Sequence, residues 1–343
     1  MEGDAKYMKK PTISVGISAY NEQLNIANVI TSFLYQKETN FILKEIIVIS
    51  DGSTDKTVEL IEQFGDDRLH LVAHSDRVGK ARRLNEIISL FSGDFLLLTD
   101  ADVLPDDQFV FEKIVDKFLK DRKTDMVLAN VRPLPAVTFF EKAINNFFYA
   151  REDQKRQFDF YSTIHGARGA GLALTRKVAK KLIFPENLII DDAFIYLFIK
   201  QSGYKVVAAK EAVIWFRSVQ TIADFKKQIM RYMRGGEQLH NFYNAELIYT
   251  TSYIPKHIMI RVLVSQLKRD ILGYLLLKAI FTYCRFYLRY NKYRTTTRWL
   301  VSKSSKNLQV QANIQTSISD PVVNRLWKMF GVLKGLLFVW FTN

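Results

Sequence analysis

Two carboxylates separated by one residue, Asp100 and Asp102, directly follow the apolar run 95–98. Carboxylates at this spacing can bind one divalent cation together, and Mg²⁺ or Mn²⁺ held in this way takes further ligands from phosphate oxygens. The pair therefore predicts a site for a metal-bound diphosphate. A solvated acidic loop is the alternative interpretation of a D-x-D motif considered alone.

Two further polar clusters precede this pair along the chain. Asn21 and Glu22 follow the β-branched run 13–18, and the segment 51–53 (Asp-Gly-Ser) follows the run 45–49. The segment 79–83 adds three cations between the second and third acidic loops. The Asp-Gly-Ser segment alone could form only a turn and a helix cap. Acidic loops after three apolar runs, with these cations between them, predict a binding site for a nucleoside diphosphate and its metal.

The elements that position these loops alternate between strand and helix. Apolar strand patterns are found at 13–18, 45–49, 69–73 and 95–98, and helical spacing is found at 24–35, 56–64 and 80–91. Near-continuous apolar strands that alternate with helices predict a parallel-rich α/β sheet covered by helices on both faces. In such sheets ligands bind at the carboxyl ends of the strands, where the acidic loops are expected.

Composition restricts the class of protein further. The chain has 343 residues, of which 48% are hydrophobic and 24% charged, so it can bury a full core and is not a disordered or collagenous protein. The single cysteine, Cys284, excludes an internal disulfide and a cysteine-cluster zinc site. The first ten residues contain no apolar signal segment, so nothing there predicts export.

Several segments resemble a known family in their order and spacing. The segments 15–22, 48–55, 78–85 and 98–102 resemble the four sequential blocks of family 2 glycosyltransferases with the GT-A fold. Later segments extend the resemblance to about residue 240. Ile190-Asp191-Asp192 resembles the acceptor-side E-D element, 228–232 resembles Q-x-x-R-W, and 166–174 resembles the Gly-rich acceptor-side segment.

The resemblance implies a role for each matching residue. The loop with Ala19, Tyr20 and Glu22 would bind the base and ribose of a nucleotide sugar together with Asp51, and Lys80 would lie close to the nucleotide. Asp100 would contact the nucleotide or the metal, and Asp102 would bind Mg²⁺ or Mn²⁺. Asp192 would be the general base in a catalytic pair with Asp191, and Arg231 would stabilise the departing diphosphate. Gln228 and Tyr232 are expected at the nucleotide-sugar site.

The sequence departs from the family pattern at three positions. Ser50 stands where many members have Asp, Asp191 replaces Glu, and Tyr232 replaces Trp. The smaller ring of Tyr232 weakens the case for a processive synthase, because it covers less of an acceptor sugar. Asp191 or Asp192 could instead only cap the helix that follows them. His165 is expected to be a packed loop residue, because no other histidine stands at ligand spacing.

The C-terminal part of the chain differs in charge from the rest. Residues 251–343 contain 15 Lys and Arg but only 2 Asp and Glu, and the whole chain has a net charge of +14. In the segment 271–292 four cations share a narrow helical arc: Lys278, Arg285, Arg289 and Lys292. This pattern predicts a helix lying in an anionic membrane interface. Within this segment the longest charge-free apolar stretch is 271–277, which disfavours spanning, although snorkelling Lys and Arg side chains near the ends leave spanning open as an alternative.

Two further C-terminal segments carry expectations. Residues 322–341 form a second apolar-basic segment, and the uncharged segment 307–319 is predicted to be a linker. A helical subdomain packed on the catalytic part and a nucleic-acid surface are the alternatives to membrane binding.

These patterns predict a GT-A domain at 1–245, with a donor half at about 11–132 and an acceptor half at about 133–245. A basic, membrane-associated helical region follows at 246–343. The predicted activity is the metal-dependent, inverting transfer of a sugar to a lipid-linked or cell-envelope glycan. The family resemblance favours a UDP-sugar as the donor. The predicted location is the cytoplasmic face of the cell membrane. The predicted partners include no nucleic acid. A sugar-nucleotide nucleotidyltransferase and a processive polysaccharide synthase are the alternatives.

Overall fold

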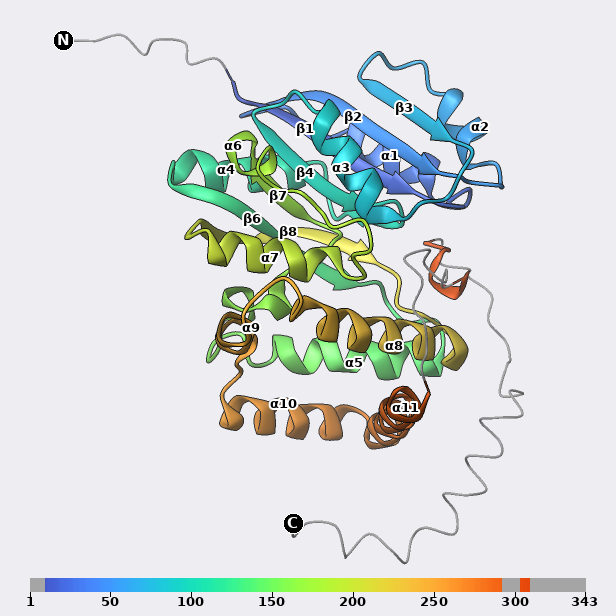
Figure 1. The fold of residues 1–343 in the computed structure, drawn as a ribbon, viewed down its shortest axis with the longest axis vertical. Helices are drawn as coiled ribbons and strands as arrows, with labels where there is room; N and C mark the ends of the chain where they lie inside the picture. The colour runs from blue at the N-terminus through green and yellow to red at the C-terminus, as the bar shows by residue number, and fades with distance from the viewer. Residues whose placement is uncertain (1–9, 292–302, 309–343) are drawn as a thin grey trace, which may run out of the picture. The chain divides into compact units, whose positions relative to one another are not determined.

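A mixed eight-stranded sheet with the order β3-β2-β1-β4-β7-β6-β8-β5 forms the centre of the protein (Figure 1). The computed structural model describes residues 10–291 and 303–308. The strands are β1 (Thr12–Ala19), β2 (Ile42–Asp51), β3 (Leu69–His74), β4 (Phe95–Asp100), β5 (Val103–Pro105), β6 (Thr124–Pro133), β7 (Leu172–Thr175) and β8 (Lys205–Phe216).

Helices cover both faces of this sheet, as the sequence predicts. One face packs against α1 (Ile26–Leu34), α2 (Thr57–Glu62) and α4 (Val110–Lys120). The other packs against α3 (Lys80–Leu90), α6 (Arg176–Ala179) and α7 (Asp191–Gln201). The helices predicted at 24–35 and 56–64 are each three residues shorter in the structure, and each loses residues at both ends. The α/β fold class is confirmed.

The parallel strands bring the acidic loops to one edge of the sheet. Strand β1 lies between β2 and β4 and is parallel to both. In this register Ala19 pairs with Ser50, and Ser18 pairs with Asp100. The three polar loops that follow these strands are therefore neighbours, although they are distant in sequence. Beyond β4 the sheet becomes mixed, because β7 is antiparallel to both β4 and β6.

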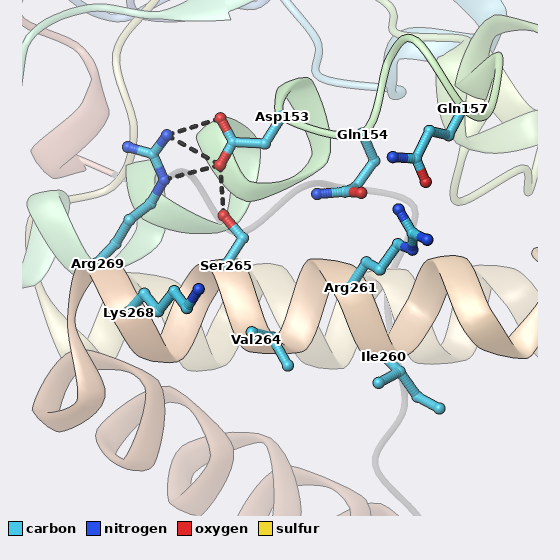
Figure 2. A pocket seen from close by; sticks show the side chains of 9 residues that line it. All are labelled: Asp153, Gln154, Gln157, Ile260, Arg261, Val264, Ser265, Lys268 and Arg269. Atoms are coloured by element: carbon cyan, nitrogen blue, oxygen red, sulfur yellow. Dashed lines mark hydrogen bonds and ion pairs between the residues drawn. The ribbon is translucent and has the colours of Figure 1, made fainter.

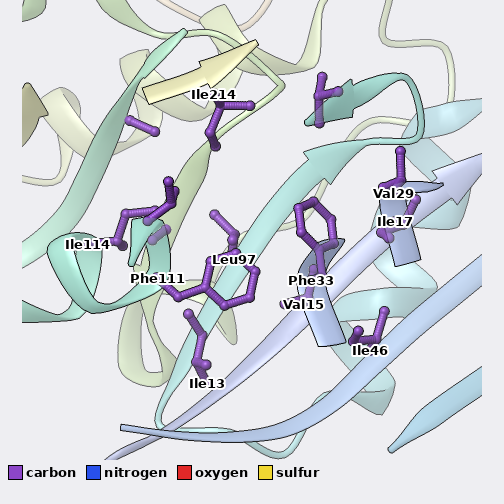
Figure 3. Packing of buried hydrophobic residues seen from close by; sticks show 14 of the residues in the cluster. Ile13, Val15, Ile17, Val29, Phe33, Ile46, Leu97, Phe111, Ile114 and Ile214 are labelled. Atoms are coloured by element: carbon purple, nitrogen blue, oxygen red, sulfur yellow. The ribbon is translucent and has the colours of Figure 1, made fainter. Parts of the chain in front are cut away.

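The core beneath this edge is apolar and tightly packed. Figure 3 shows Val15 and Ile17 of β1 together with Phe33 of α1 and Phe111 of α4. The rings of Phe33 and Phe111 lie 5.3 Å apart between centroids. On the other face α3 approaches β1 so closely at Gly16 that a methyl group there would overlap the side chain of Ile87.

The acceptor half and the residues after it add a second helical layer. It comprises α5 (Phe139–Glu152), α8 (Ile222–Leu239), α9 (Ala245–Ser252), α10 (Lys256–Arg269) and α11 (Ile271–Tyr290), with short 3₁₀ turns at Phe160–Ser162, Ile164–Gly166 and Lys303–Ser305. Helices α10 and α11 pack against α5, and α11 also packs against α8 (Figure 1). One side of α10 and α11 is therefore packed on the rest of the protein, as the alternative of a helical subdomain predicts.

The helix predicted at 271–292 is found as α11. Its buried residues, Gly273, Ile280, Cys284 and Leu288, share one side, whereas Lys278, Arg285 and Arg289 are exposed as predicted. Among the described residues, α11 is the one helix long and apolar enough to cross a membrane. The sequence argument against spanning considered only the longest stretch without charged residues. The mean hydropathy of the whole helix, in contrast, is high enough for a membrane-spanning segment. The segment 322–341 lies outside the described residues.

Candidate active site

A lysine bridges two carboxylates where the predicted donor and acceptor halves meet. Lys80, the first residue of α3, places its Nζ atom 2.6 Å from Oδ1 of Asp100 and 2.8 Å from Oδ2 of Asp191. Asp100 ends β4, and Asp191 begins α7. Burial opposes the charged ammonium, but the two carboxylates outweigh it and raise the pKa of Lys80 above its ordinary value. Three residues predicted for the site are thus brought together.

The Gly-rich segment passes directly against this cluster of Lys80, Asp100 and Asp191. A Cβ atom at Gly169 would lie 3.2 Å from Nζ of Lys80, 3.4 Å from Oδ2 of Asp100 and 3.5 Å from Oδ2 of Asp191. The absence of a side chain lets the backbone approach the three charged groups. The segment 166–174, assigned to the acceptor side by resemblance, therefore borders the cluster.

The two adjacent acids at the start of α7 have different surroundings. Asp191 is buried and paired with Lys80, whereas Asp192 is partly exposed, and its Oδ1 accepts a hydrogen bond from the backbone N–H of Ala193 at 2.8 Å. Burial and the negative charge of Asp191 raise the pKa of Asp192 to about 6. A carboxylate with this pKa can accept a proton near neutral pH. Neither acid is the N-cap, which is Ile190.

Asp102 lies in a strongly negative environment. Burial and the charges of Glu22 and Asp100 raise the pKa of Asp102 to about 8. Carboxylate oxygens are the ligands that Mg²⁺ and Mn²⁺ prefer, and a divalent cation would relieve this repulsion. The residues present therefore fit a metal. The described part of the chain has no group of three or more His, Cys, Asp or Glu side chains placed to bind an ion, so further ligands would come from elsewhere, such as a diphosphate.

The carboxylate of Asp51 holds the loop that leads into α3. Its Oδ1 accepts hydrogen bonds from the N–H of Val78 and Nε of Arg83, and its Oδ2 accepts one from the N–H of Gly79, each at 2.9 Å. Both Asp51 and Arg83 are buried. In this structure Asp51 positions the residues before Lys80, and its expected contact with a nucleotide stays a prediction.

The loop after β1 forms a platform beside Asp51. Asn21 adopts a left-handed conformation with φ of 53°, which asparagine tolerates better than most residues. Its side-chain oxygen accepts a hydrogen bond from the N–H of Thr54 at 2.7 Å. Next to it, the guanidinium of Arg77 stacks on the ring of Tyr20 at 3.8 Å from the centroid. Arg77 was not selected from the sequence, although it lies just before the Gly-Lys motif.

Lys306 is a second site residue that sequence reasoning missed. Its Nζ atom donates to the backbone oxygens of Tyr20 at 2.6 Å and Asn21 at 2.7 Å, and it lies 2.5 Å from Oε1 of Glu22. Burial raises the pKa of Glu22, and the ammonium of Lys306 acts against that rise. The sequence grouped Lys306 with cations expected at a membrane, and no spacing pattern distinguished it from them.

The neighbours of Lys306 are also held against the rest of the chain. Its backbone oxygen accepts a hydrogen bond from Nδ2 of Asn25 at 2.8 Å, and Ser304 donates to Asp224 of α8. Leu308 is buried in the core beside α1. The first two residues of the predicted linker 307–319 are therefore packed, and the rest lies outside the described residues.

The motif 228–232 lies on α8. Gln228 and Arg231 are partly buried, and Tyr232 is 44% exposed. The guanidinium of Arg231 lies 5.3 Å from the ring centroid of Tyr232 and contributes to the electrostatic environment of Asp192. His165 is exposed rather than packed, and its Nε2 contacts the backbone oxygen of Ser252 at 3.1 Å.

A cavity of about 560 Å³ lies elsewhere, between α10 and the turn after α5 (Figure 2). Asp153 at this turn is bonded to Arg269 and Ser265 of α10, and Arg261 and Lys268 also line the cavity. None of the residues predicted for the site lines it. This cavity is therefore separate from the candidate active site.

Comparison with known proteins identifies the family. Residues 14–183 match the sequence profile of Glycosyl transferase family 2. Poly-beta-1,6-N-acetyl-D-glucosamine synthase of Staphylococcus epidermidis is 29% identical over 232 residues, which cover 66% of this chain and 55% of that protein. The synthase of the same name from Staphylococcus aureus strain COL is 27% identical over 244 residues, covering 67% and 58%. The chain thus spans little more than half the length of these relatives.

A solved structure shares the fold. Mannosyltransferase PcManGT from Pyrobaculum calidifontis, in complex with GDP-Man and Mn²⁺, superposes with a TM-score of 0.55 at 19% identity, covering 83% of this chain and 77% of that one. The sheet order and this likeness define the GT-A fold. Residues 14–183 form a glycosyl transferase family 2 domain. The family match favours a glycosyltransferase over the alternative of a sugar-nucleotide nucleotidyltransferase.

Proposed function

We propose that this protein is a metal-dependent, inverting glycosyltransferase that moves a sugar from a nucleoside diphosphate to a hydroxyl group of a glycan or lipid-linked acceptor. The observation that carries the proposal is the convergence of Asp100, Asp102, Asp191 and Asp192 with Lys80 at one sheet edge. The acids of the donor half and those of the acceptor half lie on different elements, so they can flank a sugar bound between them.

On the donor side, the stacked pair of Tyr20 and Arg77 offers a flat surface to a nucleobase. Asp102 and Asp100 would hold Mg²⁺ or Mn²⁺, which when bound would stabilise negative charge on the diphosphate. Arg231 would add a fixed positive charge to the departing group. UDP is favoured over GDP by the family resemblance.

On the acceptor side, Asp192 accepts the proton of the attacking hydroxyl group. The hydroxyl oxygen then bonds to the anomeric carbon, while the bond from that carbon to the diphosphate oxygen breaks and its electron pair leaves with the diphosphate. A single displacement of this kind inverts the anomeric configuration. The negative charge of Asp191 helps to raise the pKa of Asp192, and the positive charges of Lys80 and Arg231 act against that rise.

The outer surfaces of α10 and α11 support a location at the cytoplasmic face of a membrane. Met259, Ile260, Leu272, Phe281 and Phe286 are each more than 40% exposed. Exposed cations accompany them on the same two helices, a combination that suits an anionic bilayer interface.

A processive polysaccharide synthase is the second candidate. The names of the staphylococcal relatives favour it, since both are synthases of a poly-N-acetylglucosamine. Tyr232, 44% exposed on α8, could support an acceptor sugar by stacking.

The test uses the full-length protein in detergent. Calorimetric titration with UDP and GDP, with and without Mn²⁺, measures donor recognition. Radiolabelled UDP-sugars and GDP-sugars, UDP-N-acetylglucosamine among them, are then supplied with membrane lipids. We expect manganese-assisted nucleotide binding and label in a chloroform-extractable product; insoluble polymer would instead support the processive synthase. Failure of every nucleotide to bind with Mn²⁺ would contradict the proposal.

A further inference from the structure

Arg168 lies on the acceptor side with aromatic rings as its neighbours. It stands between the 3₁₀ turn Ile164–Gly166 and β7, one residue before Gly169. Its guanidinium carbon lies 4.3 Å from the ring centroid of Phe148 and 5.8 Å from that of Phe216. Among the described residues no hydrogen bond or ion pair reaches this guanidinium, and the side chain is partly exposed to solvent. A planar cation is thus held in place while its donors remain available.

A second arginine reinforces the positive charge. Arg151 of α5 stacks on Phe160 at 4.5 Å and donates one hydrogen bond, to the backbone oxygen of His165 at 3.2 Å. Burial and the charge of Arg168 lower the pKa of Arg151 to about 9. Burial also lowers the pKa of Arg168. Two partly buried cations that repel each other destabilise the ligand-free protein.

The neighbouring acids do not compensate this charge. Glu152 is paired with Arg132 at 3.1 Å and with Lys155 at 2.7 Å, and Asp153 is paired with Arg269. Asp192 acts on Arg168 only as a charge in its surroundings, without a hydrogen bond between them. The acids that line this side are therefore either engaged or too far away to pair with the two arginines.

The position of Arg168 in the fold places its positive charge close to the candidate active site. Gly169, the next residue, borders Lys80, Asp100 and Asp191, and Phe216 pairs in the sheet with Val103, the residue after Asp102. Arg168 therefore stands beside the reacting groups, on the side of the candidate base. The proposed function assigns the donor diphosphate to Asp102 and Arg231 instead.

We propose that Arg168 and Arg151 form an anion subsite that binds a phosphate group of the acceptor. A guanidinium donates two parallel hydrogen bonds to phosphate oxygens, and the aromatic rings fix its plane in advance. The acceptor class is accordingly a phosphorylated one, such as a lipid phosphate. This inference rests on the proposed glycosyl transfer and names the acceptor class for the same site.

The test compares a lipid phosphate with its alcohol. Full-length protein in detergent is titrated with farnesyl phosphate and with farnesol, and separately with UDP and Mn²⁺. We expect farnesyl phosphate to bind more tightly than farnesol. Arg168→Met should weaken farnesyl phosphate binding roughly 10- to 100-fold, the usual loss for a hydrogen bond to a charged group. Arg122→Met is the matched control, because Arg122 is exposed in the loop between α4 and β6.

Each result supports or overturns the proposal. Equal affinity for farnesyl phosphate and farnesol overturns it, whatever the variants do. An equal loss of UDP affinity in Arg168→Met assigns the guanidinium to the donor diphosphate and also overturns it. If Arg168→Met does not fold, Arg151→Met and Arg168→Lys must show the selective loss. Failure of UDP binding in the unaltered protein counts against the proposed function, whereas phosphate selectivity would still support the subsite.

Discussion

Nζ of Lys80 lies 2.8 Å from Oδ2 of Asp191, so the first residue of α3 is ion-paired with the first residue of α7. This contact joins the predicted donor half to the predicted acceptor half. It also distinguishes the two adjacent acids, because Asp191 is ion-paired with the lysine whereas Asp192 accepts a hydrogen bond from the backbone N–H of Ala193.

Removing the Lys80 ammonium should destabilise the protein. Lys80→Met leaves Asp100 and Asp191 without their shared cation, and breaking a largely buried pair costs about 3 kcal/mol. Urea unfolding measures this loss, with Lys123→Met as an exposed control. In Lys80→Met/Asp191→Asn one repelling charge is gone, so the loss should be smaller than the sum of the single losses. Strict additivity would contradict the pairing.

Asp192→Asn should abolish most turnover without affecting donor binding. An amide cannot accept the proton of the acceptor hydroxyl, and loss of a general base lowers the rate on the order of 10²–10⁴-fold. Initial-rate measurements give kcat, and calorimetry gives the affinity for UDP with Mn²⁺. Asp67→Asn, at an exposed loop position, is the control. Full activity of Asp192→Asn would remove Asp192 from the mechanism.

The reaction should slow in acid. Because the pKa of Asp192 is raised to about 6, the carboxylate that accepts the proton is lost as the pH falls through 6. The rate should therefore rise from pH 5 to 7 and then level. Asp191→Asn removes a charge that raises this pKa, so the acid limb should move to lower pH. A pH profile of kcat/KM for both proteins checks the direction; an unmoved or upward-shifted limb would disagree.

Asp102→Asn should uncouple nucleotide binding from the metal. The amide is a weaker ligand for Mn²⁺, and replacing the carboxylate also relieves its repulsion with Glu22 and Asp100. We expect UDP affinity to lose its dependence on Mn²⁺ while the thermal midpoint is kept or rises. Calorimetry and thermal unfolding measure the two effects. Asp106→Asn, which changes a nearby acid, is the control. If the UDP affinity of Asp102→Asn depended on Mn²⁺ as strongly as that of the control, the metal would have to bind elsewhere.

Lys306→Met should weaken the loop after β1. Glu22 is buried and would lose its cation, which costs about 3 kcal/mol in a buried pair. The thermal midpoint should fall more than in Lys200→Met, where the lysine is exposed at the end of α7. Adding Glu22→Gln to Lys306→Met should recover much of the loss, because no unpaired carboxylate remains. An unchanged midpoint would show that the contact contributes little.

Local patterns predicted the alternating strands and helices of residues 13–98 well. Runs such as Ile46–Ile49 and Phe95–Leu98 are apolar on both faces, which only a covered parallel sheet accommodates, and their acidic ends then meet by geometry. The short strand β5 and the antiparallel β7 were not anticipated. Each has only three or four residues, and its pairing is determined by tertiary contacts.

Long-range contacts set the limits of prediction at the site. Lys80 and Asp191 are more than a hundred residues apart, and Lys306 is further still from Glu22. The residues next to a charged side chain in the sequence do not indicate which distant residue it will pair with in the fold. The same applies to Asp51, whose residue type suits a ligand contact, yet whose oxygens here accept three hydrogen bonds from the chain itself.

The absence of a side chain at Gly16 determines how closely α3 can pack against β1. Lys80 begins that helix, so a single added methyl group would lift the ammonium away from both acids while leaving every charged residue unchanged. A library screened only for substitutions of ionisable residues would never sample this route to an inactive enzyme.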